Sequence, residues 1–341
     1  MISIFVDFIS RLLQLKTNLS ENISALGILV DPEDTLSDLV PKLIEVQSLM
    51  TGDYRVSSLV QRDGLLTIPE NIISIANYAF YRYDNLQLNC IPDSVQNIGQ
   101  HAFFSCSTIN FASLPSSLTS IGSFAFANCC GLESLTFPTE DISIGISAFE
   151  DCTNLQIQYL PDSLAKIESK TFANCHKLNP LCLPSSLVKI DNSAFIYCKK
   201  FNPPNLPNSI TSIEANAFSN CTSLSLTELP SQLTSIRNSS FYSCGELRLS
   251  SLPPNITTIE SNAFRNCEKI TVCTMPESLE MIYARAFENC KGLTNIVFGS
   301  NISYVYADAF KDCTNITTIT VNGNYISGAP WGAVNATVIW A

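Results

Sequence analysis

Charged and catalytic residue types are scarce in this chain. Of its 341 residues only 14% are Asp, Glu, Lys or Arg, and His101 and His176 are its two histidines. Neither histidine lies in an H-E-x-x-H or triad-like setting, and no phosphate-binding glycine motif occurs. The sparse carboxylates form no repeated pair of the kind that glycosidases use, and no C-x-x-C spacing points to zinc. We therefore expect a protein without enzyme activity, metal or cofactor.

Long apolar runs and a positive net charge are also missing. No run reaches the ~20 residues that a membrane-spanning helix needs, so we expect no membrane insertion. The apolar start, residues 1–13, is interrupted by Asp7 and Arg11 and no signal-peptidase site follows, so it does not match a secretory signal. The net charge of −11 argues against a nucleic-acid partner, because such binding depends on basic surfaces.

What the chain has in abundance is periodicity. A phenylalanine recurs every 23 residues without insertion or deletion, eleven times from Phe80 to Phe310. A fixed period of about 20 to 50 residues is typical of stacked-repeat proteins. The series predicts a solenoid of eleven coils over residues 65–321, in which each coil buries its apolar positions against its neighbours.

The other apolar positions keep step with this phenylalanine. Five residues before it lies an isoleucine (Val305 in the last coil), three after it a cysteine in ten coils, six after it Leu, Ile or Phe, and eleven before it a proline in ten coils. The stretch from the leucine to the proline, such as 132–138, predicts a short strand. A second extended piece, such as 117–121, leads to the isoleucine, and Ala-Phe-x-x-Cys fits one short helical turn. Stacked strands lie about 4.8 Å apart, which predicts a rod on the order of 50 Å long.

Some coils depart from the pattern. The second apolar residue of the leucine strand lies three positions after the first at Leu135 but two after it at Ile157, so we expect this strand to shift in some coils. Pro203 and Pro204 weaken the strand of their coil, because proline lacks the N–H of a ladder bond. Asp141 occupies the position of an apolar residue in the neighbouring coils, and the pattern offers no explanation for it.

Fourteen cysteines would suggest disulfides in a secreted chain. Ten of them, however, occupy one inward position of the repeat, and free cysteine packs as a small buried hydrophobe. In-register side chains on adjacent coils would be separated by the coil spacing, which exceeds the Cβ–Cβ distance of a disulfide, about 3.8 Å. We therefore expect reduced, structural cysteines. Cys90, Cys130, Cys182 and Cys273 lie off this series.

The two ends lack the repeat. Residues 1–50 carry an apolar stripe that predicts a helix near 2–26 and a second one around 36–46. This helical module is either a cap on the first coil or an anchoring or homo-oligomerisation unit. Residues 51–64 form a connecting segment, and residues 322–341 a C-terminal cap with an edge strand at 338–339. Trp331 and Trp340 are expected to close the core; a ligand-stacking role is the alternative for Trp331.

A binding role would fall on outward positions of the leucine strand. Two outward columns, seven and ten residues after the phenylalanine, are mostly polar and low in charge, which suits several weak contacts to a protein or glycan on a cell surface. The candidate residues are Gln156, Tyr159, Asn179, Asn202, Asn205, Glu228 and Arg248. They contain no group of several aromatics or arginines of the kind that marks a binding hot spot.

Written as one motif, each coil follows L-P-x-S-L-x-x-I-x-x-x-A-F-x-x-C-x-x-L, as in residues 183–201. This pattern closely resembles the BspA-like, treponemal-type leucine-rich repeat family, over residues 65–321. The resemblance implies a curved leucine-rich-repeat solenoid of α/β type, without catalysis, that serves surface attachment and the binding of proteins or cells. It supplies no functional residues, because the shared positions are structural.

Segments 12–27 and 39–46 are similar to short segments that open bacteriophage tail-fibre-like and other structural proteins. That resemblance implies a tail-associated protein, which needs no signal peptide because lysis releases it. Three hypotheses follow. The first is a binding or adhesion solenoid on a bacterial or phage surface, located extracellularly or on a virion. The second is a phage-tail structural, spacer or receptor-binding protein assembled through residues 1–50. The third is an intracellular scaffold, which fits reduced cysteines.

Overall fold

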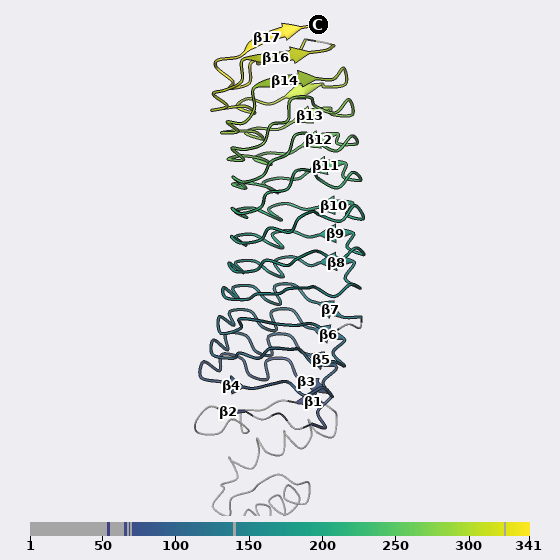
Figure 1. Ribbon diagram of the computed structural model, residues 1–341, viewed down its shortest axis with the longest axis vertical. Helices are drawn as coiled ribbons and strands as arrows, with labels where there is room; N and C mark the ends of the chain where they lie inside the picture. The colour runs from purple at the N-terminus through teal and green to yellow at the C-terminus, as the bar shows by residue number, and fades with distance from the viewer. Residues whose placement is uncertain (1–52, 55–64, 67, 69, 139–140, 324) are drawn as a thin grey trace, which may run out of the picture.

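The computed structural model describes residues 53–54, 65–66, 68, 70–138, 141–323 and 325–341. Over these residues the chain forms one stack of parallel coils that runs from β1 (Asp53–Tyr54) at one end to β17 (Thr337–Trp340) at the other (Figure 1). The stack is nearly straight in the view of Figure 1, so the curvature implied by the resemblance is slight in this plane. The helices expected within residues 1–50 lie outside the described residues.

The regular strands are short and end on the isoleucine of each coil. They are β3 (Ser74–Ile75), β5 (Asn97–Ile98), β6 (Ser120–Ile121), β7 (Ser143–Ile144), β8 (Lys166–Ile167), β9 (Lys189–Ile190), β10 (Ser212–Ile213), β11 (Ser235–Ile236), β12 (Thr258–Ile259), β13 (Met281–Ile282) and β15 (Tyr304–Val305). Pairing is parallel and in register, in three sheets ordered β1-β3-β5-β6-β7, β10-β9-β8 and β11-β12-β13-β15. We call the outer surface of these strands the isoleucine face. The second extended piece predicted from the sequence is therefore the regular one.

The leucine-to-proline segment forms named strands only near the two ends of the described stack. There β2 (Leu65–Leu66) pairs with β4 (Gln87–Leu88), and β14 (Asn295–Phe298), β16 (Thr318–Val321) and β17 form a parallel sheet. In the middle coils isolated bridges replace them, such as Tyr159 with Cys182. The sequence predicted a short strand here that shifts in some coils, and in the middle coils the strand is reduced to bridges. The spacing of two apolar residues, two in some coils and three in others, shifts the register and interrupts a continuous ladder.

The Ala-Phe-x-x-Cys segment is a run of tight turns and not the helical turn that the sequence predicted. The residues two before and two after each ladder phenylalanine have positive φ, as at Ser193 (56°) and Tyr197 (60°). Their N–H groups and that of Phe195 donate to carbonyl groups of the next coil at 2.8–2.9 Å. A helix would direct every N–H back along its own chain, so hydrogen bonding between coils replaces helix formation here.

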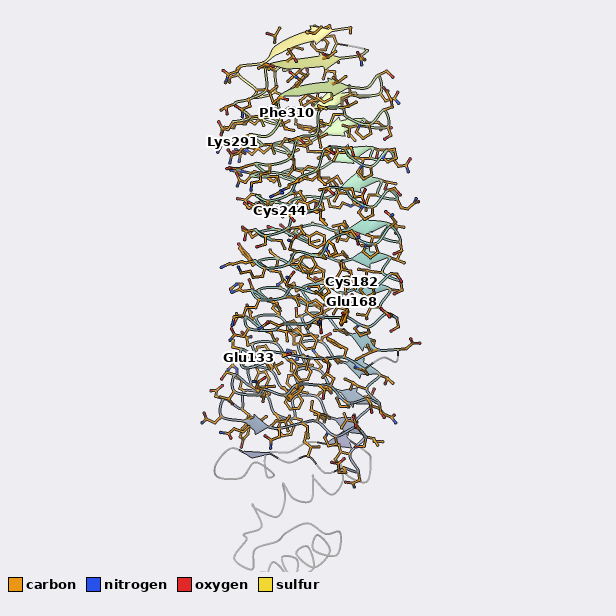
Figure 2. All side chains as sticks on the ribbon, viewed as in Figure 1. Glu133, Glu168, Cys182, Cys244, Lys291 and Phe310 are labelled. Carbon is orange, nitrogen blue, oxygen red and sulfur yellow. The ribbon has the colours of Figure 1, made fainter. Side chains whose placement is uncertain are left out.

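A ladder of phenylalanine rings fills the centre of the stack. All eleven are fully buried, and successive ring centroids lie 5.1–5.7 Å apart with nearly parallel planes. Beyond Phe310, labelled in Figure 2, the carbonyl of Trp331 accepts the N–H of Phe310, and the Trp331 ring meets Phe298 edge-on at 5.8 Å. Trp331 is 1% exposed and closes the core, as predicted. Trp340 is 40% exposed, so the same expectation for Trp340 is wrong.

A second ladder consists of the ten in-register cysteines. Each thiol donates to the backbone carbonyl of the phenylalanine in the preceding coil at 2.9–3.1 Å, as Cys221 does to Phe195. Burial raises the pKa of the ladder thiols from Cys106 to Cys290, to about 12 for Cys106. All fourteen cysteines are free, as the sequence predicted. The position thus selects a small apolar side chain that can also donate a hydrogen bond.

The irregular coils are accommodated locally. Asp141 is exposed, and the next residue, Ile142, is buried in its place. The chain therefore shifts by one residue to keep an apolar side chain inside. Residues 201–206, which contain Pro203 and Pro204, form neither a strand nor a bridge, as the missing N–H groups predicted.

Glycines on the isoleucine face allow adjacent coils to approach closely. A Cβ built on Gly122 would lie 2.6 Å from the backbone nitrogen of Gln100 and 2.7 Å from the carbonyl carbon of Gly99. We expect Gly122→Ala to lower the free energy of unfolding by about 2 kcal/mol, because the coils must separate to admit the methyl group. Gly245→Ala is the control, since its Cβ would meet nothing closer than 4.0 Å. Equal urea midpoints for Gly122→Ala and wild type would contradict this prediction.

Candidate binding surfaces

The seven sequence-predicted residues all lie at the surface of the stack. Their side chains are exposed, that of Tyr159 with 55% of the residue accessible. They are Gln156, Tyr159, Asn179, Asn202, Asn205, Glu228 and Arg248, which we call the strand face. Because a column advances by one coil at a time, the set extends over five successive coils rather than converging on a pocket. Such a surface suits contact with an extended partner and offers no enclosed reaction site.

Two strand-face asparagines also have a structural role. The Oδ1 atom of Asn179 accepts the backbone N–H of Asn202 at 3.0 Å, and Oδ1 of Asn202 accepts the N–H of Ser225 at 2.9 Å and its hydroxyl at 3.0 Å. These bonds satisfy backbone donors where the middle coils lack a strand ladder. We call them the amide ladder. The sequence did not reveal this role, because it depends on the strands being absent.

The arginine of the strand face is partly engaged in ion pairing. The Arg248 guanidinium lies 3.5 Å from the Glu246 carboxylate, and Lys269 lies 2.6 Å from the same group. The hydrogen bond from Lys269 lowers the pKa of Glu246. Glu246 and Lys269 border a groove of about 430 Å³, lined also by Glu268, Lys291 and Gly292. Since its glutamates and lysines pair with one another, the groove is polar but nearly neutral.

A ladder of ion pairs runs along the middle of the isoleucine face. Neighbouring acidic and basic groups lie 2.6–3.8 Å apart in an unbroken series over five coils, in the order Glu168, Lys166, Asp191, Lys189, Glu214, Arg237 and Glu260. Figure 2 places Glu168 on the side of the stack opposite to that of Lys291. Three basic and four acidic groups largely neutralise one another and, being partly exposed to solvent, stabilise the stack modestly. In the sequence, the charged residues of this ladder occupy the columns six and four residues before the phenylalanine.

Two aromatic clusters were missed at the sequence level. At the C-terminal end of the isoleucine face, Tyr283 stacks on Tyr306 at 4.9 Å, and Tyr304 contacts Tyr306 at 4.5 Å. Tyr304 is 48% exposed. These tyrosines belong to two columns that are polar in most other coils, so only a column-by-column comparison would have found them.

The second aromatic cluster lies on the turns of the first coils. His101 stacks between Tyr78 and Phe124 at 4.8 Å on each side, and Tyr81 stacks on Phe104 at 5.1 Å. Burial lowers the pKa of His101. The histidine is therefore neutral at physiological pH and acts as an aromatic spacer in the stack.

The described part of the chain contains neither a metal-binding cluster nor a membrane-spanning helix. Within it, no group of three or more His, Cys, Asp or Glu side chains could hold a metal ion. The same residues include no helix with the length and hydropathy to cross a bilayer. The surfaces described above are thus the recognisable candidates for a function, and each consists of side chains suited to non-covalent contact.

The parallel coils and their inward Leu, Ile and Phe side chains define a leucine-rich-repeat solenoid. The chain belongs to the BspA-type leucine-rich repeat family, whose six-copy model matches residues 73–202 and 188–317. No curated protein matches the chain.

Several solved structures are similar. A leucine-rich repeat protein from Bacteroides ovatus is 22% identical, with 85% of each chain covered and a TM-score of 0.49. A leucine-rich cell surface protein from Faecalibacterium prausnitzii is 21% identical, with 85% of this chain and 89% of that chain covered and a TM-score of 0.47. The pneumococcal vaccine antigen PcpA is 16% identical, with coverage of 82% and 79% and a TM-score of 0.46. Similarity at this level carries no information about what this chain binds.

Proposed function

We propose that this chain is a non-enzymatic binding and adhesion solenoid, displayed on a bacterial or phage surface, that recognises a protein or glycan partner through its strand face. The observation that supports this is the contrast between core and surface. The buried positions repeat from coil to coil, whereas the exposed strand-face column seven residues after the phenylalanine changes from Gln156 to Asn179, Asn202, Ser225 and Arg248. A spacer needs no such change.

An extended surface of this kind acts through many weak contacts. Each coil contributes one or two exposed polar side chains, and the rigid core holds them at a fixed spacing, so that little conformational entropy is lost on binding. Repeated contacts to one partner then add up to an avidity that no single coil provides. This mode of binding fits a cell-surface polymer or a repetitive protein.

The alternative functions have less support. The phage-tail and spacer hypotheses depend on assembly through residues 1–50, which lie outside the described residues. The intracellular scaffold draws on the free cysteines. Burial and a raised pKa keep the ladder thiols protonated, as in Cys129 and Cys175, and a protonated thiol reacts slowly with oxidants in any compartment. The cysteines therefore do not favour an intracellular location over an extracellular one.

The test is binding of the labelled full chain to arrays of cell-surface glycans and immobilised cell-surface proteins. For any partner found, we expect Tyr159→Ala/Arg248→Ala to weaken binding roughly tenfold or more, because truncated anchors lose their contacts. Tyr304→Ala on the isoleucine face is the matched control, since Tyr304 is exposed to 48% and Tyr159 to 55%. Equal loss in both variants, or no partner on any array, would contradict the proposal.

A further inference from the structure

Three lysines on two adjacent coils have no acidic partner. Lys177, Lys199 and Lys200 are exposed and form no ion pair with any residue that the structure describes. With His176 they make up what we call the basic patch. A concentration of uncompensated positive charge is unusual in a chain whose net charge is −11.

The coil geometry brings these side chains together. Lys177 and Lys200 occupy the same position of successive coils, five residues after Phe172 and Phe195, whose ring centroids lie 5.6 Å apart. The N–H of Lys200 donates to the carbonyl of His176 at 3.2 Å. Burial and the nearby charge of Lys199 lower the pKa of His176, and Asp151 acts weakly in the opposite direction. The charge of the patch therefore comes from the three lysines.

The patch lysines lie in the columns four and five residues after the phenylalanine, and lysines in these columns are paired further along the stack. There each lysine binds a glutamate of the neighbouring coil, Lys269 to Glu246 at 2.6 Å and Lys291 to Glu268 at 3.1 Å. The coil before the patch has Thr153 and Asn154 in these positions, and the coil after it has Thr222 and Ser223. In these two columns the basic patch is thus bordered by neutral polar groups. The carboxylate of Asp151 acts on His176 but forms no ion pair with the three lysines, which are available to an external anion.

The amide ladder adds directed donors next to the patch. Asn179 and Asn202 each lie two residues after a patch lysine, on the other side of a buried Leu178 or Phe201. Their Oδ1 atoms are occupied by backbone N–H groups of the next coil. Each amide is therefore held in one orientation, and its Nδ2 group remains as a donor with no bond to another described residue. Ammonium groups and N–H donors without a carboxylate among them form a surface for an anion.

We propose that the basic patch, with the amides of Asn179 and Asn202, binds a glycan that carries sulfate or carboxylate groups. The inference rests on the proposed function and names the chemistry of its partner. A glycan fits better than an acidic protein segment, because the neighbouring side chains of these columns, Thr153, Asn154, Thr222 and Ser223, are amides and hydroxyls and not the aromatic or arginine anchors of a protein hot spot. The patch spans two coils, so it would hold two or three acidic groups of one oligosaccharide.

The experiment uses the full chain and three oligosaccharides of equal length in calorimetric titrations: a sulfated heparin fragment, a hyaluronan fragment that carries only carboxylates, and a neutral maltooligosaccharide. We expect an acidic oligosaccharide to bind and the neutral one not to bind, and binding to weaken with salt. Preference between the two acidic fragments distinguishes sulfate from carboxylate. The double variant Lys177→Gln/Lys200→Gln should weaken binding roughly tenfold or more, because both substitutions remove contacts to the charged groups of the glycan.

The matched control is Lys269→Gln/Lys291→Gln, which removes the same charge from the same side of the stack. We expect it to bind like wild type. Equal loss in the two double variants would overturn the proposal in favour of net charge alone, and failure of both acidic fragments to bind would overturn it outright. Tighter binding of polyglutamate than of either glycan would replace the glycan with an acidic protein segment. One further outcome is that Lys177→Gln/Lys200→Gln still binds, as tightly as wild type, a partner found on the glycan and protein arrays. In that case only this inference would fail, and the proposed function would stand.

Discussion

Raising the pH above neutrality is expected to unfold this protein at about pH 9 to 10, through the cysteine ladder. Burial raises the pKa of nine ladder thiols, those of Cys106, Cys129, Cys152, Cys175, Cys198, Cys221, Cys244, Cys267 and Cys290. A raised pKa in the folded state stabilises the fold fully below the unfolded-state pKa of about 8.5. This stabilisation is lost as the pH rises towards the folded-state pKa, which is about 12 for Cys106.

The size of the effect follows from the number of thiols. One pH unit above 8.5, each thiol that ionises only in the unfolded chain lowers the free energy of unfolding by about 1.4 kcal/mol. Nine such thiols together approach the whole stability of an ordinary protein, about 5 to 15 kcal/mol. If the stack unfolds as one unit, alkali alone should therefore be sufficient to unfold it.

The measurement is the urea midpoint at several pH values up to about pH 10, in reducing buffer, followed by the fluorescence of buried Trp331. The control is Cys198→Ala/Cys221→Ala/Cys244→Ala, which removes three of the nine thiols. This variant is less stable at neutral pH, but its loss of stability per pH unit should be smaller by about a third. A urea midpoint that did not change between neutral pH and about pH 10 would contradict the prediction.

Phe195→Ala is expected to lower the free energy of unfolding by about 4 kcal/mol. The Phe195 ring is fully buried, stacks at 5.6 Å on Phe172 and on Phe218, and lies 4.4 Å from Phe201. Truncation removes the apolar transfer energy and leaves a cavity that the two adjoining coils cannot close without breaking their hydrogen bonds. Urea denaturation monitored by circular dichroism measures the change.

Two comparisons make this result specific to the ladder. Phe195→Leu should lose less stability than Phe195→Ala, because a leucine fills part of the cavity. Val188→Ala, at a residue that is 43% exposed in the coil of Phe195, should change stability by no more than ~0.5 kcal/mol. Similar losses for Val188→Ala and Phe195→Ala would mean that the ring stack is not the main source of stability in this coil.

The sequence was sufficient for the core and for the class of fold. A single column of phenylalanines and one of cysteines, each at a fixed interval of 23 residues, leave no other arrangement than stacked coils. The sequence did not predict the conformation of the backbone between these columns. Ser193 and Tyr197 have positive φ without being glycine, so nothing in their identity announced the turns that replace the predicted helical turn.

The candidate site was predictable only in part. Exposure of the strand face followed from its alternation with buried residues, but the structural role of Asn179 and Asn202 depends on which backbone N–H groups lack a strand partner. The basic patch was within reach of the sequence, because Lys177 and Lys200 are one period apart. The sequence alone did not show that these lysines are unpaired. Whether a lysine forms an ion pair depends on the side chain opposite it in the neighbouring coil, as Glu246 opposite Lys269 shows.

The hydrogen bonds between coils run along the axis of the stack, and this direction determines how the protein responds to tension between its ends. The N–H groups of Ser193, Phe195 and Tyr197 all point to the next coil, so a pull along the axis loads one row of bonds at a time instead of all rows at once. The outermost coil would detach first, and each coil released would add about 80 Å of extended chain. An adhesin of this construction would behave as an extensible tether, lengthening in equal steps while the coils that remain hold their partner.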